Sequence, residues 1–209
     1  MPLARRQPAR HHMTIELSPK AAEIASSARA LLALGGYNGF SYADISDQVR
    51  IAKASIHHHF ASKADLVEVV VKLHREESNK GLASLTEQVA DPVAELKAYA
   101  DYWSACILDG STSFCICAML AAELPAVPGN VAREVQAFFQ DLTAWLAGVF
   151  KRGASSGAFH LQGTPAQEAK AFMATVYGAM LAARAYGDPR TFQAVVFPAI
   201  ERLAAPTRQ

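Results

Sequence analysis

Residues 51–66 read IAKASIHHHFASKADL, and this stretch decides the fold. We expect a short helix over residues 52–60, and Ser62 with Asp65 three residues later is typical of the capping start of another helix. Upstream, Ser41 is expected to cap a short helix over residues 42–49, which a brief turn separates from the helix that follows. Two short helices joined by a tight turn have the dimensions of a helix-turn-helix.

The helical period continues on both sides of this motif. Ser18-Pro19, Asp91-Pro92, Thr164-Pro165 and Asp188-Pro189 predict further helix starts, and apolar residues recur every three or four positions from 131 to 150. In the helix after Ser62 we expect the apolar stripe Leu66, Val69, Val70 and Leu73, and between residues 153 and 163 we expect a loop. The sequence therefore predicts an all-α fold of about nine helices, with an N-terminal three-helix unit and a larger C-terminal helical domain.

Charge is distributed unevenly along the 209 residues, although the formal net charge is only +1. Residues 1–63 hold eight Lys or Arg and four acidic side chains, whereas the remainder holds twelve and fifteen. The front of the chain, including an expected basic disordered arm over residues 1–17, therefore suits the phosphates of nucleic acid. The composition excludes collagen-like, disulfide-scaffold and low-complexity proteins, and we expect no membrane span and a cytoplasmic location.

Side chains that reach nucleic acid concentrate on the expected second helix of the motif. In a helix-turn-helix this helix enters the major groove, and Lys53 and Ser55 near its start are candidate readers of bases or phosphates. The backbone amides that follow Ser41 are a candidate phosphate anchor. The run of histidines over residues 57–59 is favoured as a DNA contact over a metal site, because ligands of one ion usually lie three or four residues apart on a helix.

The amino-acid sequence of residues 21–66 resembles that of the DNA-binding domain of the TetR family of transcriptional regulators. The matching features are the run over residues 51–66, together with Ala-Arg-Ala-Leu at 28–31, Gly36-Tyr37, Gly39-Phe40-Ser41 and Asp44-Ile45. The resemblance implies that Ile56 and Phe60 pack the small domain and that the DNA contacts are Ser41, Tyr42, Lys53, Ser55, His57, His58 and Lys63. Arg50 stands where the family usually has Gly, and Ala52 where a Ser or Thr caps the recognition helix.

The resemblance also implies two domains with different functions. Residues 18–64 form the DNA-binding domain, and residues 65–209 bind an effector and form a homodimer through the last two helices. The expected effector pocket is apolar, and its candidate lining residues are Trp103, Cys106, Phe114, Cys117, Phe139, Trp145, Phe172, Met173 and Tyr177. The expected protein is a ligand-responsive repressor that binds a pseudo-palindromic operator in double-stranded DNA and is released by a small molecule; it is not an enzyme and needs no cofactor or metal.

Three interpretations of the cysteines stay open. Cys106, Cys115 and Cys117 are either small core residues or, in part, sensors of oxidants or electrophiles in a cysteine-based regulator, and a small all-α thiol enzyme is the remaining alternative. The Cys115-x-Cys117 pair alone makes a poor zinc site because no third or fourth ligand is evident. Residues 153–157 match G-x-S-x-G, but they follow a helix rather than a strand, which disfavours a hydrolase nucleophile elbow.

Overall fold

A computed structural model describes residues 16–110 and 114–204 of the chain, so the predicted basic arm lies almost entirely outside the described residues. Within these ranges the fold is all-α, as predicted, and contains no strand. The helices are α1 (Pro19–Gly35), α2 (Tyr42–Val49), α3 (Lys53–His59), α4 (Lys63–Gln88), α5 (Pro92–Leu108), α6 (Ile116–Ala122), α7 (Gly129–Ser156), α8 (Pro165–Tyr186) and α9 (Arg190–Ala204). None of the helices in the described ranges is long and apolar enough to cross a membrane.

Local signals in the sequence set the ends of α1 to α3. Ser18 caps α1 ahead of Pro19, and Gly36 ends it with a positive φ of 71°. Ser41 and Asp44 form a reciprocal capping box at the start of α2. The turn into α3 needs a left-handed residue, and Arg50 takes that conformation with φ 55° and ψ 48°. Ile45 and Ile56 are fully buried, so α2 and α3 are fixed against α1 by a small apolar core.

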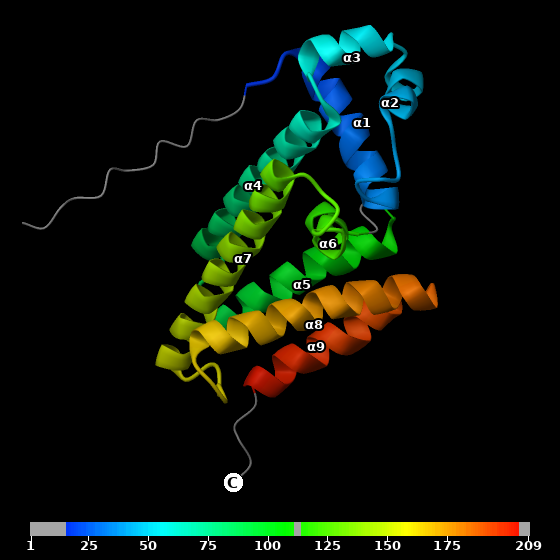
Figure 1. Cartoon of the computed structure of the whole chain (residues 1–209). Coiled ribbons are helices and arrows are strands. Elements are labelled where there is room, and N and C mark those ends of the chain that lie inside the picture. The colour runs from blue at the N-terminus through cyan, green and yellow to red at the C-terminus, as the bar shows by residue number, and fades with distance from the viewer. Residues whose placement is uncertain (1–15, 111–113, 205–209) are drawn as a thin grey trace, which may run out of the picture.

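The larger domain is built around two long helices. Figure 1 shows α4 and α7 running side by side away from the small domain, with α5, α8 and α9 packed across their far ends and α6 lying close to α1. Between the long helices, Arg75 on α4 pairs with Glu134 at 3.2 Å and with Asp141 at 2.6 Å on α7. The apolar faces of these two helices supply much of the core. On α7 the helical period of apolar residues correctly predicted the burial of Val131, Val135, Leu142, Leu146 and Phe150.

The two parts of the molecule are joined by polar contacts to the middle and the C-terminal end of α1. The carboxylate of Glu123, just after α6, accepts a hydrogen bond from the backbone N–H of Tyr37 at 2.6 Å. Arg184 on α8 donates to the carbonyl of Leu34 at 2.9 Å, and Arg29 in the middle of α1 pairs with Glu77 on α4 at 2.6 Å. These contacts connect the larger domain to the helix that supports α2 and α3.

The structure corrects the predicted loop over residues 153–163. Helix α7 continues through this point to Ser156 and ends at Gly157, which has a φ of 76°. Gly153 does not end the helix. It lies within α7 and packs against the Phe159 ring, since a Cβ atom at this position would lie 2.0 Å from that ring. The G-x-S-x-G match therefore lies mostly within a helix, which removes the strand-to-helix turn that a nucleophile elbow requires.

Candidate functional site

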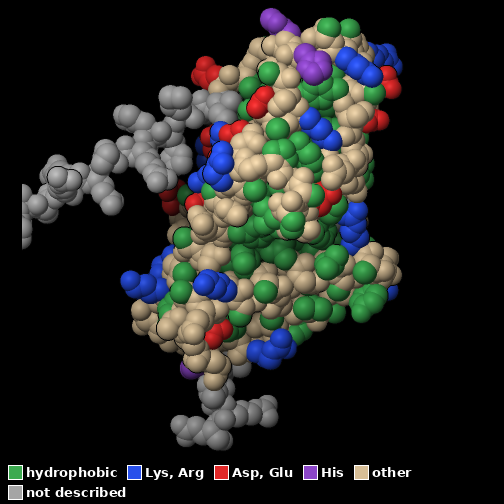
Figure 2. Space-filling model, in the orientation of Figure 1, with side chains coloured by type: hydrophobic (Ala, Val, Ile, Leu, Met, Phe, Trp, Pro, Cys, Tyr) green, Lys and Arg blue, Asp and Glu red, His purple; other side chains and the backbone are tan. Residues whose placement is uncertain are grey.

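The surface of α3 is the first candidate site. Lys53, Ser55 and His58 are exposed, while Ile56 and Phe60 are buried. Figure 2 shows histidine side chains at the end of the molecule where α3 lies in Figure 1. The helix therefore presents cationic and hydrogen-bonding groups to solvent at one end of the molecule, as a helix that enters a DNA groove must.

Tyr42 and His57 connect α2 to α3. The Tyr42 hydroxyl donates to the carbonyl of Phe60 at 3.1 Å, and the His57 ring stands edge-on to the Tyr42 ring at 4.8 Å. The His57 Nδ1 atom donates to the carbonyl of Ala61 at 3.2 Å, which leaves Nε2 as the other ring nitrogen for an outside partner. Burial, with a contribution from Asp65, raises the pKa of Tyr42 to about 12, so this hydroxyl remains a donor at neutral pH.

Lys63 lies at the junction of α4 with the small domain. Its ammonium group donates to the carbonyl of Phe40 and lies 4.7 Å from the Tyr37 ring centroid and 4.1 Å from that of Phe40. Partial burial lowers the pKa of the Lys63 amine. These contacts occupy the side chain within the protein, so its predicted contact with DNA remains a prediction.

The N-terminus of α2 is already occupied by protein groups. The Ser41 hydroxyl accepts from the backbone N–H of Ala43 at 3.1 Å and donates to the Asp44 carboxylate at 2.8 Å. Hydrogen bonds from Ser41 lower the pKa of Asp44. A phosphate at this helix start would have to share the site with the Asp44 carboxylate, and the predicted anchor at Ser41 stays a prediction.

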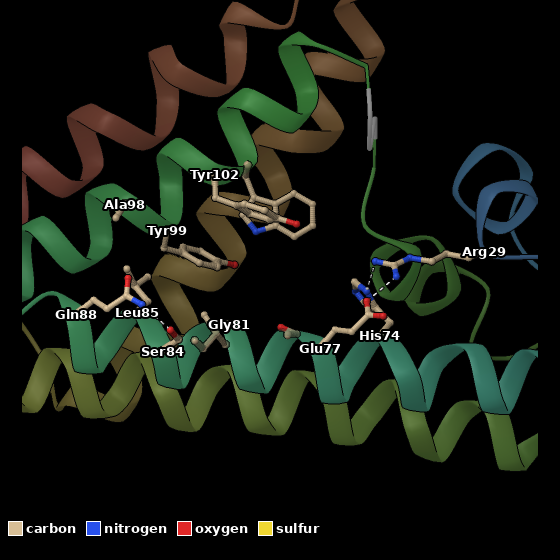
Figure 3. A pocket seen from close by; sticks show the side chains of 13 residues that line it. Arg29, His74, Glu77, Gly81, Ser84, Leu85, Gln88, Ala98, Tyr99 and Tyr102 are labelled. Atoms are coloured by element: carbon tan, nitrogen blue, oxygen red, sulfur yellow. Dashed lines mark hydrogen bonds and ion pairs between the residues drawn. The ribbon is translucent and has the colours of Figure 1, made fainter. Parts of the chain in front are cut away.

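A cavity of about 410 Å³ opens between α4 and α5. Figure 3 shows Tyr99 and Tyr102 on α5 facing Gly81 and Ser84 on α4, with Arg29 and His74 at one end. The remaining lining residues are Glu77, Ser78, Leu82, Leu85, Gln88, Ala98 and Trp103. The volume lies in the range of small-molecule sites, and the wall combines aromatic faces with a few polar groups.

The structure places only Trp103 of the predicted pocket residues on the wall of this cavity. Most of the others lie in the surrounding core. Phe139 packs edge-on against Tyr177 at 5.2 Å, Met173 accepts a hydrogen bond from Thr143, and Phe172 meets Phe150. The Arg184 guanidinium lies over the Phe114 ring, and the Trp145 indole N–H donates a hydrogen bond to Thr86 at 2.9 Å. Cys106 is partly exposed, whereas Cys117 is buried. The sequence missed the polar members of the wall because α4 presents them only once it packs opposite α5.

A fully buried carboxylate lies behind the aromatic wall. Glu95 on α5 has no exposed surface, accepts a hydrogen bond from Thr86 at 2.5 Å and pairs with Arg152 of α7. Tyr99 lines the cavity, and its ring lies 5.4 Å from that of Trp145, which donates to Thr86 of this network. The network stabilises α5 against α4 and α7, and nothing in the local sequence pattern around Glu95 distinguishes it from a surface residue.

His74 and two cysteines form a second polar cluster. Cys115 Sγ lies 3.7 Å from His74 Nε2, and the Tyr177 hydroxyl donates to the same sulfur at 3.9 Å. Burial alone would raise the pKa of the Cys115 thiol, but hydrogen bonds from Cys117 and His74 hold that pKa well below its usual range. Burial and the neighbouring Cys115 raise the pKa of Cys117. The sequence offered no third ligand for the cysteine pair because His74 is 41 residues from Cys115.

Comparisons with known proteins decide the family. Residues 24–70 match the model of the bacterial regulatory proteins of the tetR family, and residues 92–196 match the tetracyclin repressor-like C-terminal domain. The chain belongs to the TetR family. A TetR-family transcriptional regulator from Agrobacterium tumefaciens is 50% identical, with 89% of this chain and 98% of that chain covered at a TM-score of 0.88. The comparison with curated proteins gave no match.

Two further solved structures are similar. A TetR transcriptional regulator from Legionella pneumophila is 27% identical over 90% of this chain and 98% of that one, with a TM-score of 0.80. The structure of AibR in complex with isovaleryl coenzyme A and operator DNA has a TM-score of 0.69 at 19% identity, covering 90% and 99% of the two chains, and shows a shared fold. These comparisons confirm the family expected from residues 21–66 and the all-α fold expected from the helical period of the chain. TetR-family members are ligand-responsive DNA-binding regulators and are generally not enzymes.

Proposed function

We propose that this TetR-family protein is a repressor that binds a pseudo-palindromic operator as a homodimer and is released by a small molecule in the cavity between α4 and α5. The observation that carries the proposal is the exposure of Lys53, Ser55 and His58 on α3, opposite the buried Ile56. With this geometry α3 enters the major groove, where these side chains contact base edges and phosphates. The basic excess of residues 1–63 turns this end of the protein toward DNA during encounter.

The dimer forms through α8 and α9. Ala171, Ala174, Gly178, Leu181 and Ala185 are all exposed and recur at helical spacing along one face of α8. A Cβ atom at Gly178 would meet nothing within 4 Å, and Leu181 is 59% exposed. Small side chains let two helices approach closely, and on α9 Val195 adds apolar surface. Two-fold pairing of this face gives two copies of α3 that read half-sites in successive major grooves.

A ligand bound in the cavity changes the position of α1 through Arg29. This side chain lines the cavity and also pairs with Glu77 on α4. A ligand that fits better when Arg29 is displaced favours a different position of α1, and hence of α3, by its differential affinity for the two states. The AibR complex is a precedent within the fold for an acyl coenzyme A ligand and operator DNA on one protein.

A cysteine-based regulator is the second candidate, because Cys115 contacts His74, which itself contacts Arg29. Reaction of this thiol would disturb the same connection to α1. A thiol enzyme is disfavoured, since Cys115 and Cys117 are both fully buried and a substrate would have little access to either sulfur.

Selection of bound DNA from a random pool tests the proposal. Purified protein should enrich a sequence with two-fold symmetry whose half-sites lie about one helical turn, roughly 34–36 Å, or a multiple of it apart. Affinity for this sequence should fall steeply with salt, because several phosphates are neutralised. Enrichment of no sequence, or of a single asymmetric half-site, would contradict operator binding as a dimer.

A further inference from the structure

The cluster of His74, Cys115 and Cys117 has the donor set of a metal site. One ligand atom from each residue lies within 4.8 Å of the other two, and all three residues are buried. His74 comes from α4, Cys115 caps α6 and Cys117 lies in its first turn. Two sulfur ligands and one imidazole suit thiophilic d10 cations, such as Zn²⁺ and Cd²⁺, and are unsuited to Mg²⁺ or Ca²⁺.

Arg29 fixes which nitrogen of His74 carries the proton. The Arg29 Nη2 atom lies 3.1 Å from His74 Nδ1, and a guanidinium can only donate hydrogen bonds. In this contact Nδ1 must therefore accept, and Nε2 is the ring nitrogen that carries the proton. That N–H points at Cys115 Sγ, 3.7 Å away, and the donor chain runs from Arg29 through His74 to the sulfur.

We propose that His74, Cys115 and Cys117 bind one thiophilic divalent cation, and that binding breaks the contact between His74 and Arg29 and so weakens operator binding. The second half rests on the proposed function, whereas the metal site stands without it. To ligate the cation, Nε2 must offer its lone pair, so the ring proton moves to Nδ1, and both sulfurs bind as thiolates, any proton still on them passing to solvent. The two thiolates then balance the charge of the cation.

The displaced proton makes the contact with Arg29 repulsive. Nδ1–H would face the Arg29 N–H groups, donor against donor, and the guanidinium would lose the imidazole as an acceptor. Arg29 would keep only its ion pair with Glu77, whose side chain is 60% exposed, and such exposed pairs contribute little. Since Arg29 belongs to α1, which carries α2 and α3, the change reaches the DNA-binding surface.

The cavity provides a path to this buried site. His74 and Arg29 both line the cavity between α4 and α5, so a cation that enters the cavity meets the imidazole first. The Tyr177 hydroxyl, which donates to Cys115 Sγ at 3.9 Å, borders the cluster on the α8 side and offers an oxygen beside it. Tetrahedral coordination by two sulfurs, a nitrogen and an oxygen is a common arrangement for zinc.

Titration with Cd²⁺ tests the site, in anaerobic buffer with a phosphine reductant so that thiol oxidation is excluded. The full chain should bind one Cd²⁺ tightly, with an ultraviolet thiolate-to-metal charge-transfer band, and a large excess of Zn²⁺ should compete for the same site. The Cys115→Ser/Cys117→Ser variant should lose the band, and His74→Gln should lower the affinity at least about tenfold. Cys106→Ser is the matched control, because this thiol lies outside the cluster, and should bind as the wild type does.

The site is refuted if the double serine variant keeps the band while its metal-free melting curve shows that it is folded. If the double serine variant does not fold, the His74→Gln variant, which keeps both sulfurs, provides the test. Unchanged Cd²⁺ affinity of His74→Gln would equally overturn the three-ligand site.

Operator affinity with and without Cd²⁺ tests the coupling. Binding should weaken about 5- to 150-fold in the wild type, and EDTA should restore it. Arg29→Met should still bind Cd²⁺, at least as tightly as the wild type, but should show no change in operator affinity. An unchanged wild-type affinity with the site filled would overturn the coupling, whereas a protein that binds Cd²⁺ but never binds DNA would contradict the proposed function instead.

Discussion

Glu123 holds the backbone N–H of Tyr37 at 2.6 Å, and these residues lie 86 positions apart in the chain. The contact joins the segment after α6 to the loop between α1 and α2. The carboxylate also fills the space beside Gly36, where a Cβ atom would lie 2.6 Å from a Glu123 oxygen. One carboxylate thus fixes the loop that leads into the helix-turn-helix.

Glu123→Leu should loosen this connection. The Tyr37 N–H would lose a charged acceptor, and hydrogen bonds of this kind contribute about 1.5–3 kcal/mol to the free energy of unfolding. Urea unfolding should show a loss of that size, and hydrogen exchange at the Tyr37 amide should accelerate. Glu87→Leu, at an exposed position on α4, is the control and should change neither measurement; equal effects in both variants would argue against the contact.

Arg50→Gly should stabilise the turn between α2 and α3. Among the described residues, Arg50 is the only one other than glycine with a positive φ, and the left-handed conformation costs a residue with a side chain about 1–2 kcal/mol. Part of this gain is offset by the greater backbone freedom of glycine when unfolded. The melting temperature should rise, while Arg50→Ala, which keeps the strain and removes the charge, should not raise it.

Gly81→Trp should block the response to an effector in the cavity. Gly81 lines the cavity, and a Cβ atom there meets nothing within 4 Å, so a large side chain can fill the space without disturbing α4. Release from DNA by whole-cell metabolite extract that releases the wild type should be lost, while operator affinity stays within about twofold. Gly81→Ala is too small to fill the cavity and should still respond; a full response from Gly81→Trp would place the effector elsewhere.

Leu181→Glu should yield monomers. A charge in the centre of the exposed apolar face of α8 would have to be buried without a partner when two copies pair. Light scattering should give the mass of one 22.4 kDa chain, and operator binding should fall sharply because only one half-site is then read. Leu34→Glu, at an exposed position on α1, should remain dimeric.

Short-range signals predicted most of the helix starts. Ser18, Ser41, Ser62, Asp91 and Thr164 all cap helices in the structure as expected, because capping depends on residues within three positions of one another. The end of α7 was predicted too early. Glycine often ends a helix, but Gly153 lies within α7, where the absence of a side chain makes room for the Phe159 ring. The sequence does not show that the fold brings Phe159 against Gly153.

The site residues divide in the same way. The exposed α3 side chains were predictable because the motif is local, whereas the cavity depends on how α4 packs against α5. The predicted stripe on α4 was partly wrong, since the structure buries Leu66, Val67, Val70, Val71 and His74 and leaves Val69 and Leu73 half-buried. Because α4 contacts α1 and α7 on different sides, its buried face is wider than a single stripe. His74 therefore became visible as a partner of Cys115 only in the structure.

The most direct test of DNA recognition by α3 is a mobility-shift titration of the Lys53→Ala/His58→Ala variant on the selected operator. Both side chains are exposed on α3 and neither contributes to the core, so the variant should remain a folded dimer but lose operator binding. The matched control Lys97→Ala/His160→Ala removes the same two residue types from exposed positions in the larger domain and should bind normally. Unchanged operator affinity of the α3 variant would contradict the assignment of α3 as the reading helix.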